Sequence, residues 1–262
     1  MYFIAKTFTP ILNTENFQSI FGGKDGASVS IDNQGFIRAL ESIAFPKTKF
    51  KMLKKHPSHV LEVTTKDYPY PGPFFVDSRF LLEVADNHPE RILELPSSYC
   101  VLQTLDSLLG HRYFWGGNCL GIAEILSLYP PKKQVVDTTT LNWQLKGFDC
   151  SGLMYYASSG FTPRNTSSWV NFGNPVSIER KKVEEIIGFL KPLDAIVWKG
   201  HIIFVQDKEY VIESRAGKGV IKTKTQERLQ NLINIEGKTP KNNWEEGLEP
   251  QFLIRRWHPE FT

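Results

Sequence analysis

Cys150 stands out as a residue that could do chemistry, because polar side chains flank it and an apolar run follows it. Residues 147–161 read GFDCSGLMYYASSGF, with Asp149 and Ser151 on either side of the cysteine. The apolar run predicts a buried helix that begins near Cys150 and ends at Gly160. At a helix N-terminus the unpaired N–H groups and the helix dipole favour an anion, so a thiol there is more readily the nucleophilic thiolate.

A cysteine nucleophile needs a base, and His201 is the best candidate. It lies in WKGHIIFV, directly before a β-branched strand that would hold its backbone rigidly. Twelve residues later, in YVIESR, Glu213 falls on the neighbouring strand of a predicted hairpin, where a carboxylate can orient an imidazole. Pairing with Arg215, or simple solvation on the strand, is the alternative interpretation of Glu213.

The remaining cysteines and histidines predict no further chemistry. Cys100 and Cys119 are expected to be small buried hydrophobes. The sequence has no CxxC, no HxxxH and no clustered set of ligands, so we expect no metal site. Thiolate, imidazole and hydrogen-bond donors suffice for the predicted chemistry, so no cofactor is expected.

Composition narrows the class of protein. The chain has 262 residues, 41% hydrophobic and 23% charged, as folded globular proteins do. A net charge of +3 gives no indication of a nucleic-acid partner. An odd count of three cysteines is typical of a reducing compartment. With no signal peptide and no apolar run long enough for a bilayer, we expect a cytoplasmic protein without a membrane partner; an export signal trimmed from the sequence is the alternative.

The elements that must position these residues fall into two domains. Residues 1–82 contain short β-rich runs punctuated by Pro, Gly, Asn and Asp, which predicts a small barrel. Residues 83–98 are polar and interrupted by proline, as linkers are. Residues 99–262 show helical runs first and then strand-like runs, an α+β layout of helices on an antiparallel sheet.

Several segments together resemble the NlpC family of papain-like cysteine peptidases, which cleave bacterial cell-wall peptides. FDCSGL is similar to the nucleophile signature of that family, and LLGHRYFWGGN to its upstream Tyr and Trp-Gly-Gly. FTPRNTSSW is similar to the segment after the nucleophile helix, and LKPLDAIVWKGHIIFV to the strand pair that carries the histidine. All four occur in family order over residues 99–221. The first domain resembles the bacterial SH3-like domains of one branch of the family.

The resemblance implies an activity and a set of roles. The activity is that of an endopeptidase for the bond between γ-D-Glu and diaminopimelate in small peptidoglycan-derived peptides with a free N-terminal L-Ala. Such a substrate in the cytoplasm implies cell-wall recycling. Cys150 would be the nucleophile, His201 the base and Glu213 the third polar residue, where the family usually has His and sometimes Asn or Gln. The substrate-binding residues implied are Tyr113, Asp149, Ser151 and Thr166.

Two other functions fit the same residues. One is a module that binds a cell-wall peptide without cutting it, which the departure at Glu213 permits. The other is a thiol amidase or acyltransferase acting on a different bond. An intact Cys–His pair favours catalysis, because a binding module has no chemical need for it. The sequence does not indicate the oligomeric state, the diamino acid tolerated or the peptide length preferred.

Overall fold

The computed structural model describes residues 1–248 and 250–262 and divides into two compact units. Unit 1 comprises Met1–Leu93 and Phe114–Asp149, and unit 2 comprises Glu94–Tyr113 and Cys150–Thr262. This division crosses the predicted domain boundary. Residues 114–149, which the sequence analysis assigned to the second domain, group with the N-terminal residues.

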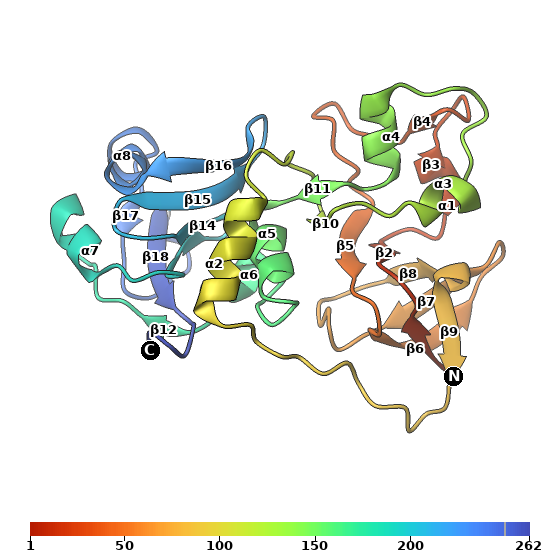
Figure 1. The fold of residues 1–262 in the computed structure, drawn as a ribbon, viewed down its shortest axis with the longest axis horizontal. Helices are drawn as coiled ribbons and strands as arrows, with labels where there is room; N and C mark the ends of the chain where they lie inside the picture. The colour runs from red at the N-terminus through yellow and green to blue at the C-terminus, as the bar shows by residue number, and fades with distance from the viewer. Residues whose placement is uncertain (249) are drawn as a thin grey trace. The chain divides into compact units, whose positions relative to one another are not determined.

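Unit 1 is built on an antiparallel sheet of short strands. Its seven strands are β1 (Tyr2–Ala5), β2 (Thr9–Leu12), β5 (Leu40–Ala44), β6 (Lys49–Lys55), β7 (Val60–Thr64), β8 (Phe74–Asp77) and β9 (Leu81–Val84). They pair in the order β5-β2-β8-β7-β6-β1-β9. Over the described residues this path ends at β5 and β9 and does not close, so the predicted SH3-like barrel is not confirmed (Figure 1).

Smaller elements complete unit 1. They are α1 (Phe17–Ile20), β3 (Phe21–Gly22), β4 (Ser28–Val29), η1 (Ser78–Phe80), β10 (Asn118–Cys119), α3 (Glu124–Leu128), α4 (Asp137–Trp143) and β11 (Gly147–Phe148). One apolar core includes buried residues from both stretches of the chain, among them Phe50 and Trp143. The buried Asn118 side chain donates to the carbonyl of Ile43 at 2.8 Å and accepts from its N–H at 3.0 Å. These bonds tie residues 114–149 to strand β5.

Unit 2 has the α+β composition that the sequence predicted. Its helices are α2 (Ser98–Ser107), α5 (Cys150–Ala157), α6 (Thr166–Trp169), α7 (Val183–Phe189), α8 (Thr225–Gln230) and the π-helical turn η2 (Asn231–Ile235). Its strands are β12 (Asn174–Pro175), β13 (Ala195–Trp198), β14 (His201–Val205), β15 (Tyr210–Arg215), β16 (Gly219–Lys224), β17 (Thr239–Pro240) and β18 (Gln251–Arg256). The strand-like runs read from the sequence coincide with β13 to β16 and β18.

The sheet of unit 2 positions the predicted base. Strands follow the order β12-β18-β13-β14-β15-β16, and β17 adds to β18. β13, β14, β15 and β16 form successive antiparallel pairs, so the predicted hairpin of β14 and β15 is confirmed. Helix α5 packs against β14, β15 and α2. Helices α2 and α5 lie side by side in Figure 1. The helix that begins with Cys150 therefore contacts the strands that carry His201 and Glu213.

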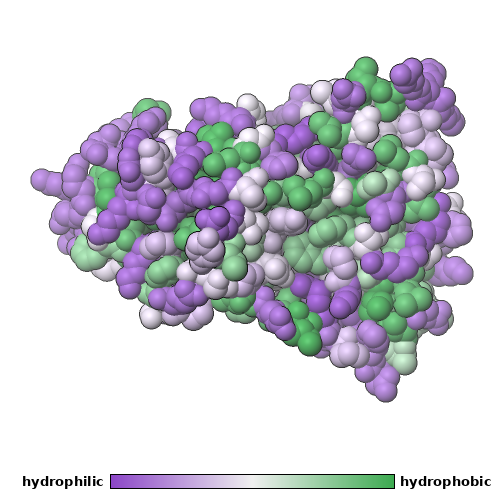
Figure 2. All heavy atoms as spheres, viewed as in Figure 1, coloured by the Kyte–Doolittle hydropathy of each residue, from purple (hydrophilic) through white to green (hydrophobic). Residues whose placement is uncertain are grey.

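Helices α7 and α8 contribute to an apolar core of unit 2. This core contains Val205 and Val211 from the sheet, Ile186 from α7 and Leu229 from α8. α7 buries Ile186 and exposes acidic residues in its first turn, and Figure 2 shows a mostly hydrophilic surface over α7 and α8. Among the described residues, no helix combines the length and the apolarity needed to cross a bilayer.

Candidate active site

The predicted nucleophile begins helix α5, as the sequence indicated. Cys150 is the first of the eight residues of the helix. Cys150 and Asp149 are each 9% exposed, and Ser151 is 4% exposed. The dipole of the helix gives positive potential at its N-terminus, where Cys150 lies.

Two glycines of the Trp-Gly-Gly segment fix the chain just before the cysteine. Asp149 N–H donates to the carbonyl of Gly117 at 2.9 Å, next to the short pair of β10 and β11. A Cβ on Gly117 would lie 2.5 Å from the carbonyl oxygen of Gly147. Gly116 has φ +69°, and a Cβ there would lie 2.6 Å from the carbonyl oxygen of Leu40. Both positions require glycine because neighbouring backbone approaches too closely for any side chain.

The predicted base and its orienting residue are in direct contact. His201 Nε2 lies 2.6 Å from Glu213 Oε2. His201 begins β14 and is partly buried, whereas Glu213 lies within β15 and is 1% exposed. An ionised carboxylate only accepts hydrogen bonds, so Nε2 carries the proton and Nδ1 carries the lone pair. This tautomer leaves Nδ1 as the ring nitrogen that can take a proton.

Glu213 also forms a buried ion pair with Arg228. Arg228 Nε donates to Glu213 Oε1 at 2.7 Å, and Nη2 donates to Oε2 at 3.3 Å. Burial raises the pKa of the Glu213 carboxyl, but hydrogen bonds and charge interactions with His201 and Arg228 outweigh it and lower the pKa to about 2. The alternative partner weighed from the sequence was Arg215, and the structure pairs the carboxylate with Arg228 instead.

Thr166 holds the turn that precedes the base. Its Oγ1 accepts a hydrogen bond from Gly200 N–H at 3.0 Å. Gly200 has φ +110° and lies between β13 and β14, directly before His201. The resemblance implied that Thr166 binds substrate, and the structure shows that its hydroxyl accepts a bond from the turn. Trp198, opposite His201 in the strand register, places its ring 5.2 Å from the imidazole.

Ser151 and Tyr113 lie on either side of the start of α5 in sequence, in different surroundings. Arg164 is 3% exposed, and its Nη1 donates to Ser151 Oγ at 3.2 Å. The Ser151 hydroxyl therefore has one acceptor site engaged by a cation. Tyr113 is half-buried, and the segment before it is held by a hydrogen bond of 2.7 Å from Val220 N–H of β16 to the His111 carbonyl.

The other two cysteines differ from Cys150. Burial raises the pKa of the Cys119 thiol to about 12, with only a partial offset from the Gly121 N–H. Cys119 is therefore a chemically inert core residue, as expected. Cys100 is exposed on α2, so the prediction that it is buried was wrong. It lies on the outward side of an amphipathic helix whose Val101 and Leu105 face the core.

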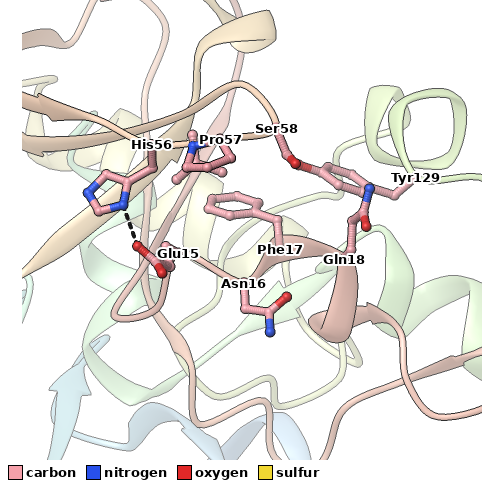
Figure 3. Close-up of a pocket in the computed structure, with 9 residues that line it drawn as sticks. Glu15, Asn16, Phe17, Gln18, His56, Pro57, Ser58 and Tyr129 are labelled. Carbon is pink, nitrogen blue, oxygen red and sulfur yellow. Dashed lines mark ion pairs between the residues drawn. The ribbon is translucent and has the colours of Figure 1, made fainter.

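A pocket in unit 1 contains none of the predicted site residues. It has a volume of about 180 Å³ and is lined by a segment around α1, by the turn between β6 and β7, and by Tyr129 (Figure 3). An ion pair between Glu15 and His56 lies at its rim, and the Phe17 ring stacks on Tyr129 with centroids 6.1 Å apart. Within residues 1–248 and 250–262, no three metal-ligating side chains gather in a way that could hold an ion.

Comparison with known proteins identifies the fold. Neither the protein-family models nor the curated proteins include a match to this sequence. Among solved structures, the chain is similar to an NlpC/P60 family protein from Bacillus cereus ATCC 10987. The two share 14% identity with a TM-score of 0.59, over 99% of this chain and 100% of that one.

Two other similar structures superpose less well. NlpC1 from Trichomonas vaginalis has 13% identity and a TM-score of 0.36, over 98% of this chain and 69% of that chain. RipD from Mycobacterium tuberculosis, described as a non-catalytic NlpC/p60 domain protein adapted to peptidoglycan binding, has 17% identity and a TM-score of 0.35. That match spans 62% of this chain and 98% of RipD. The Bacillus cereus match shows that this chain has the fold of an NlpC/P60 protein.

Proposed function

We propose that this protein is a cysteine endopeptidase that hydrolyses the γ-D-Glu–diaminopimelate bond of small peptidoglycan-derived peptides with a free N-terminal L-Ala. The observation that carries the proposal is the arrangement in unit 2. Cys150 begins a buried helix, and this helix packs on the two strands that bear a hydrogen-bonded His201–Glu213 pair. The fold shared with an NlpC/P60 protein agrees with it, as do the four sequence segments.

The proposed reaction begins with proton transfer from the Cys150 thiol to Nδ1 of His201. The thiolate attacks the γ-carbonyl carbon of D-Glu, and the carbonyl electron pair moves to oxygen. Backbone N–H groups at the start of α5 are the proposed donors to this oxyanion, because the N-terminal end of a helix favours negative charge. Glu213 stabilises the imidazolium formed in this step, since its carboxylate accepts from Nε2–H.

Collapse of the intermediate completes the reaction in two further steps. The C–N bond breaks, and His201 returns its proton to the departing amine of diaminopimelate. Water then loses a proton to the same nitrogen and attacks the thioester, which releases L-Ala-D-Glu and restores the thiol. Every proton moves through Nδ1, so the tautomer set by Glu213 matters in both halves of the reaction.

We propose that the protein recognises the free ammonium group at the N-terminus of the substrate. An ammonium that leaves water needs an anionic acceptor, and the Asp149 carboxylate beside the nucleophile supplies that charge. Ser151 already accepts from Arg164, so we assign it a supporting role and Asp149 the main one. A free amine as the recognised group fits small peptides in the cytoplasm, so we propose cell-wall recycling as the setting.

The test is mass spectrometry of L-Ala-γ-D-Glu-meso-diaminopimelate after incubation with the protein. We expect release of free diaminopimelate by the natural chain and by Cys100→Ala, which removes an exposed cysteine outside the site. Cys150→Ala should lower the rate by on the order of 10⁴-fold or more. A peptide acetylated at its L-Ala amine should be cleaved poorly, and Asp149→Asn should reproduce this loss with the free peptide.

Three results would contradict the proposal. Release of diaminopimelate that persists in Cys150→Ala would show that Cys150 is not the nucleophile. Equal cleavage of the acetylated peptide would show that the free ammonium is not required. No release by any variant, together with binding of the peptide in calorimetry, would establish the binding module in place of the enzyme.

A further inference from the structure

The Glu213 carboxylate lies between two basic side chains, one of which the reaction itself does not require. His201 contacts one carboxylate oxygen at 2.6 Å, and Arg228 contacts the other at 2.7 Å. Arg228 is 3% exposed, and its side chain comes from α8, which packs against β15 and β16. A buried guanidinium at this place touches the orienting residue and not the nucleophile or the base.

We propose that Arg228 is a positioning residue that holds Glu213 ionised and aimed at His201, and so selects the imidazole tautomer that catalysis needs. The inference rests on the proposed function, because it assigns Arg228 a role in the reaction of Cys150 and His201.

The state of Glu213 decides which nitrogen of His201 can act. An ionised Glu213 accepts from Nε2–H and leaves the lone pair at Nδ1. A protonated Glu213 would instead donate to Nε2 and place the ring proton at Nδ1, where it could not accept the thiol proton. Burial favours this protonated form, and the hydrogen bonds with His201 and with Arg228 oppose it. Of these two partners, only the guanidinium keeps its charge throughout the proposed reaction, so it holds the carboxyl ionised and, through it, the tautomer.

The guanidinium is itself held from the far side. Arg228 Nη1 donates to Glu236 Oε1 at 2.7 Å, and Glu236 follows the π-helical turn η2 directly. Glu236, Arg228 and Glu213 carry a summed charge of −1, so Arg228 does not cancel the negative charge that faces His201. Because the planar guanidinium is bound to Glu236 on one side and to both oxygens of Glu213 on the other, it can hold the Glu213 side chain in one rotamer.

The test compares charge and geometry at position 228 in the full chain. Arg228→Met removes both, Arg228→Lys keeps the charge, and Arg228→Gln keeps donors without charge and replaces the Met variant if that one does not fold. Arg256→Met is the matched control, because Arg256 also pairs with a buried carboxylate, Asp194, at the opposite end of β13 from the turn before His201. Melting temperature is measured for every variant.

Activity on the peptide gives the first readout. For Arg228→Met we expect kcat about tenfold lower at neutral pH, KM within about twofold, and an acidic limb of the pH profile moved to higher pH. Arg228→Lys should recover most of the loss. Arg228→Met combined with Glu213→Gln should be no slower than Glu213→Gln alone. Arg256→Met should lower the melting temperature and leave the pH profile in place.

Alkylation of Cys150 by iodoacetamide, followed by peptide mapping against pH, gives a second readout that needs no substrate. It should show the same order of variants. If the peptide is not cleaved but this order holds, the proposed function fails and the role of Arg228 stands. Three results would overturn the inference: an unchanged pH profile in folded Arg228→Met, losses that multiply in the double variant, or an equal shift in Arg256→Met.

Discussion

The buried Glu213 carboxylate makes a quantitative prediction about acid stability. Its pKa falls from an ordinary 4.5 to about 2, with the raising effect of burial outweighed by His201 and Arg228. At about 1.4 kcal/mol per pKa unit, this amounts to about 3.5 kcal/mol of stability at neutral pH. The folded state has the lower pKa, so this contribution is complete above pH 4.5 and is lost as the pH falls through about 2.

Glu213→Gln isolates this contribution, because glutamine is neutral at every pH. The difference in unfolding free energy between the natural chain and the variant should shrink by about 1.3 kcal/mol between pH 5.5 and pH 3.5. In this window histidines of the unfolded chain are already charged and contribute little to the change. The loss should steepen below pH 4.5, where the unfolded carboxyl binds a proton and the folded one does not.

Urea unfolding followed by tryptophan fluorescence measures this difference. Four of the six tryptophans, Trp169, Trp198, Trp244 and Trp257, lie in unit 2 and report its unfolding. Glu209→Gln is the control, because Glu209 pairs with Lys224 on the surface, where water screens the interaction. A difference for Glu213→Gln that stays constant with pH would refute the reasoning, since it would mean that folding does not lower the pKa of the Glu213 carboxyl.

Two further predictions concern the segments that support the site. Thr166→Val removes the acceptor of the Gly200 N–H while keeping the side-chain volume, so kcat should fall about tenfold with KM nearly constant. A rise in KM with kcat unchanged would instead make Thr166 a substrate ligand. Gly219→Ala should destabilise unit 2 by more than about 2 kcal/mol, because φ is +77° and the Cβ would lie 2.3 Å from the His111 carbonyl oxygen. Gly217→Ala, with the same φ of +77° and open space around it, should cost only about 1 kcal/mol in thermal or urea unfolding.

The fold of unit 2 could be read from local patterns, whereas that of unit 1 could not. Strands β13 to β16 are apolar runs separated by short turns, so period, length and pairing all follow from sequence neighbours. In unit 1 the boundary depends on contacts across the chain. Asn118 binds the backbone of Ile43, 75 residues earlier, and no local pattern indicates such a partner. Whether a sheet closes into a barrel likewise depends on pairing between its two edge strands, here β5 and β9, which short β-rich runs do not specify.

The candidate site shows the same division between local and distant information. His201 and Glu213 are twelve residues apart on a hairpin, so their contact followed from the turn between two strands. The hydrogen bond from Gly200 to Thr166 joins the turn before β14 to the start of α6, 34 residues earlier, and was not predictable, although both residues belong to segments that the sequence singled out. Arg228 carries no motif, and its side chain reaches Glu213 only because α8 folds back onto β15.

Burial explains why a glutamate at position 213 requires a partner of this kind. A histidine, asparagine or glutamine at the third position can orient an imidazole as a neutral group, and burying it requires hydrogen bonds but no counter-ion. The Glu213 carboxylate is 1% exposed, so it places a full negative charge inside the sheet. If the imidazole of His201 were its only partner, this charge would be balanced only while the imidazole is protonated. Arg228 removes this dependence, because a guanidinium stays charged while His201 gains and loses its proton in the proposed reaction. The glutamate at position 213 and the buried arginine on α8 are therefore one feature of the site: a change at Glu213 acts on His201 directly, and we expect a change at Arg228 to act on it through Glu213.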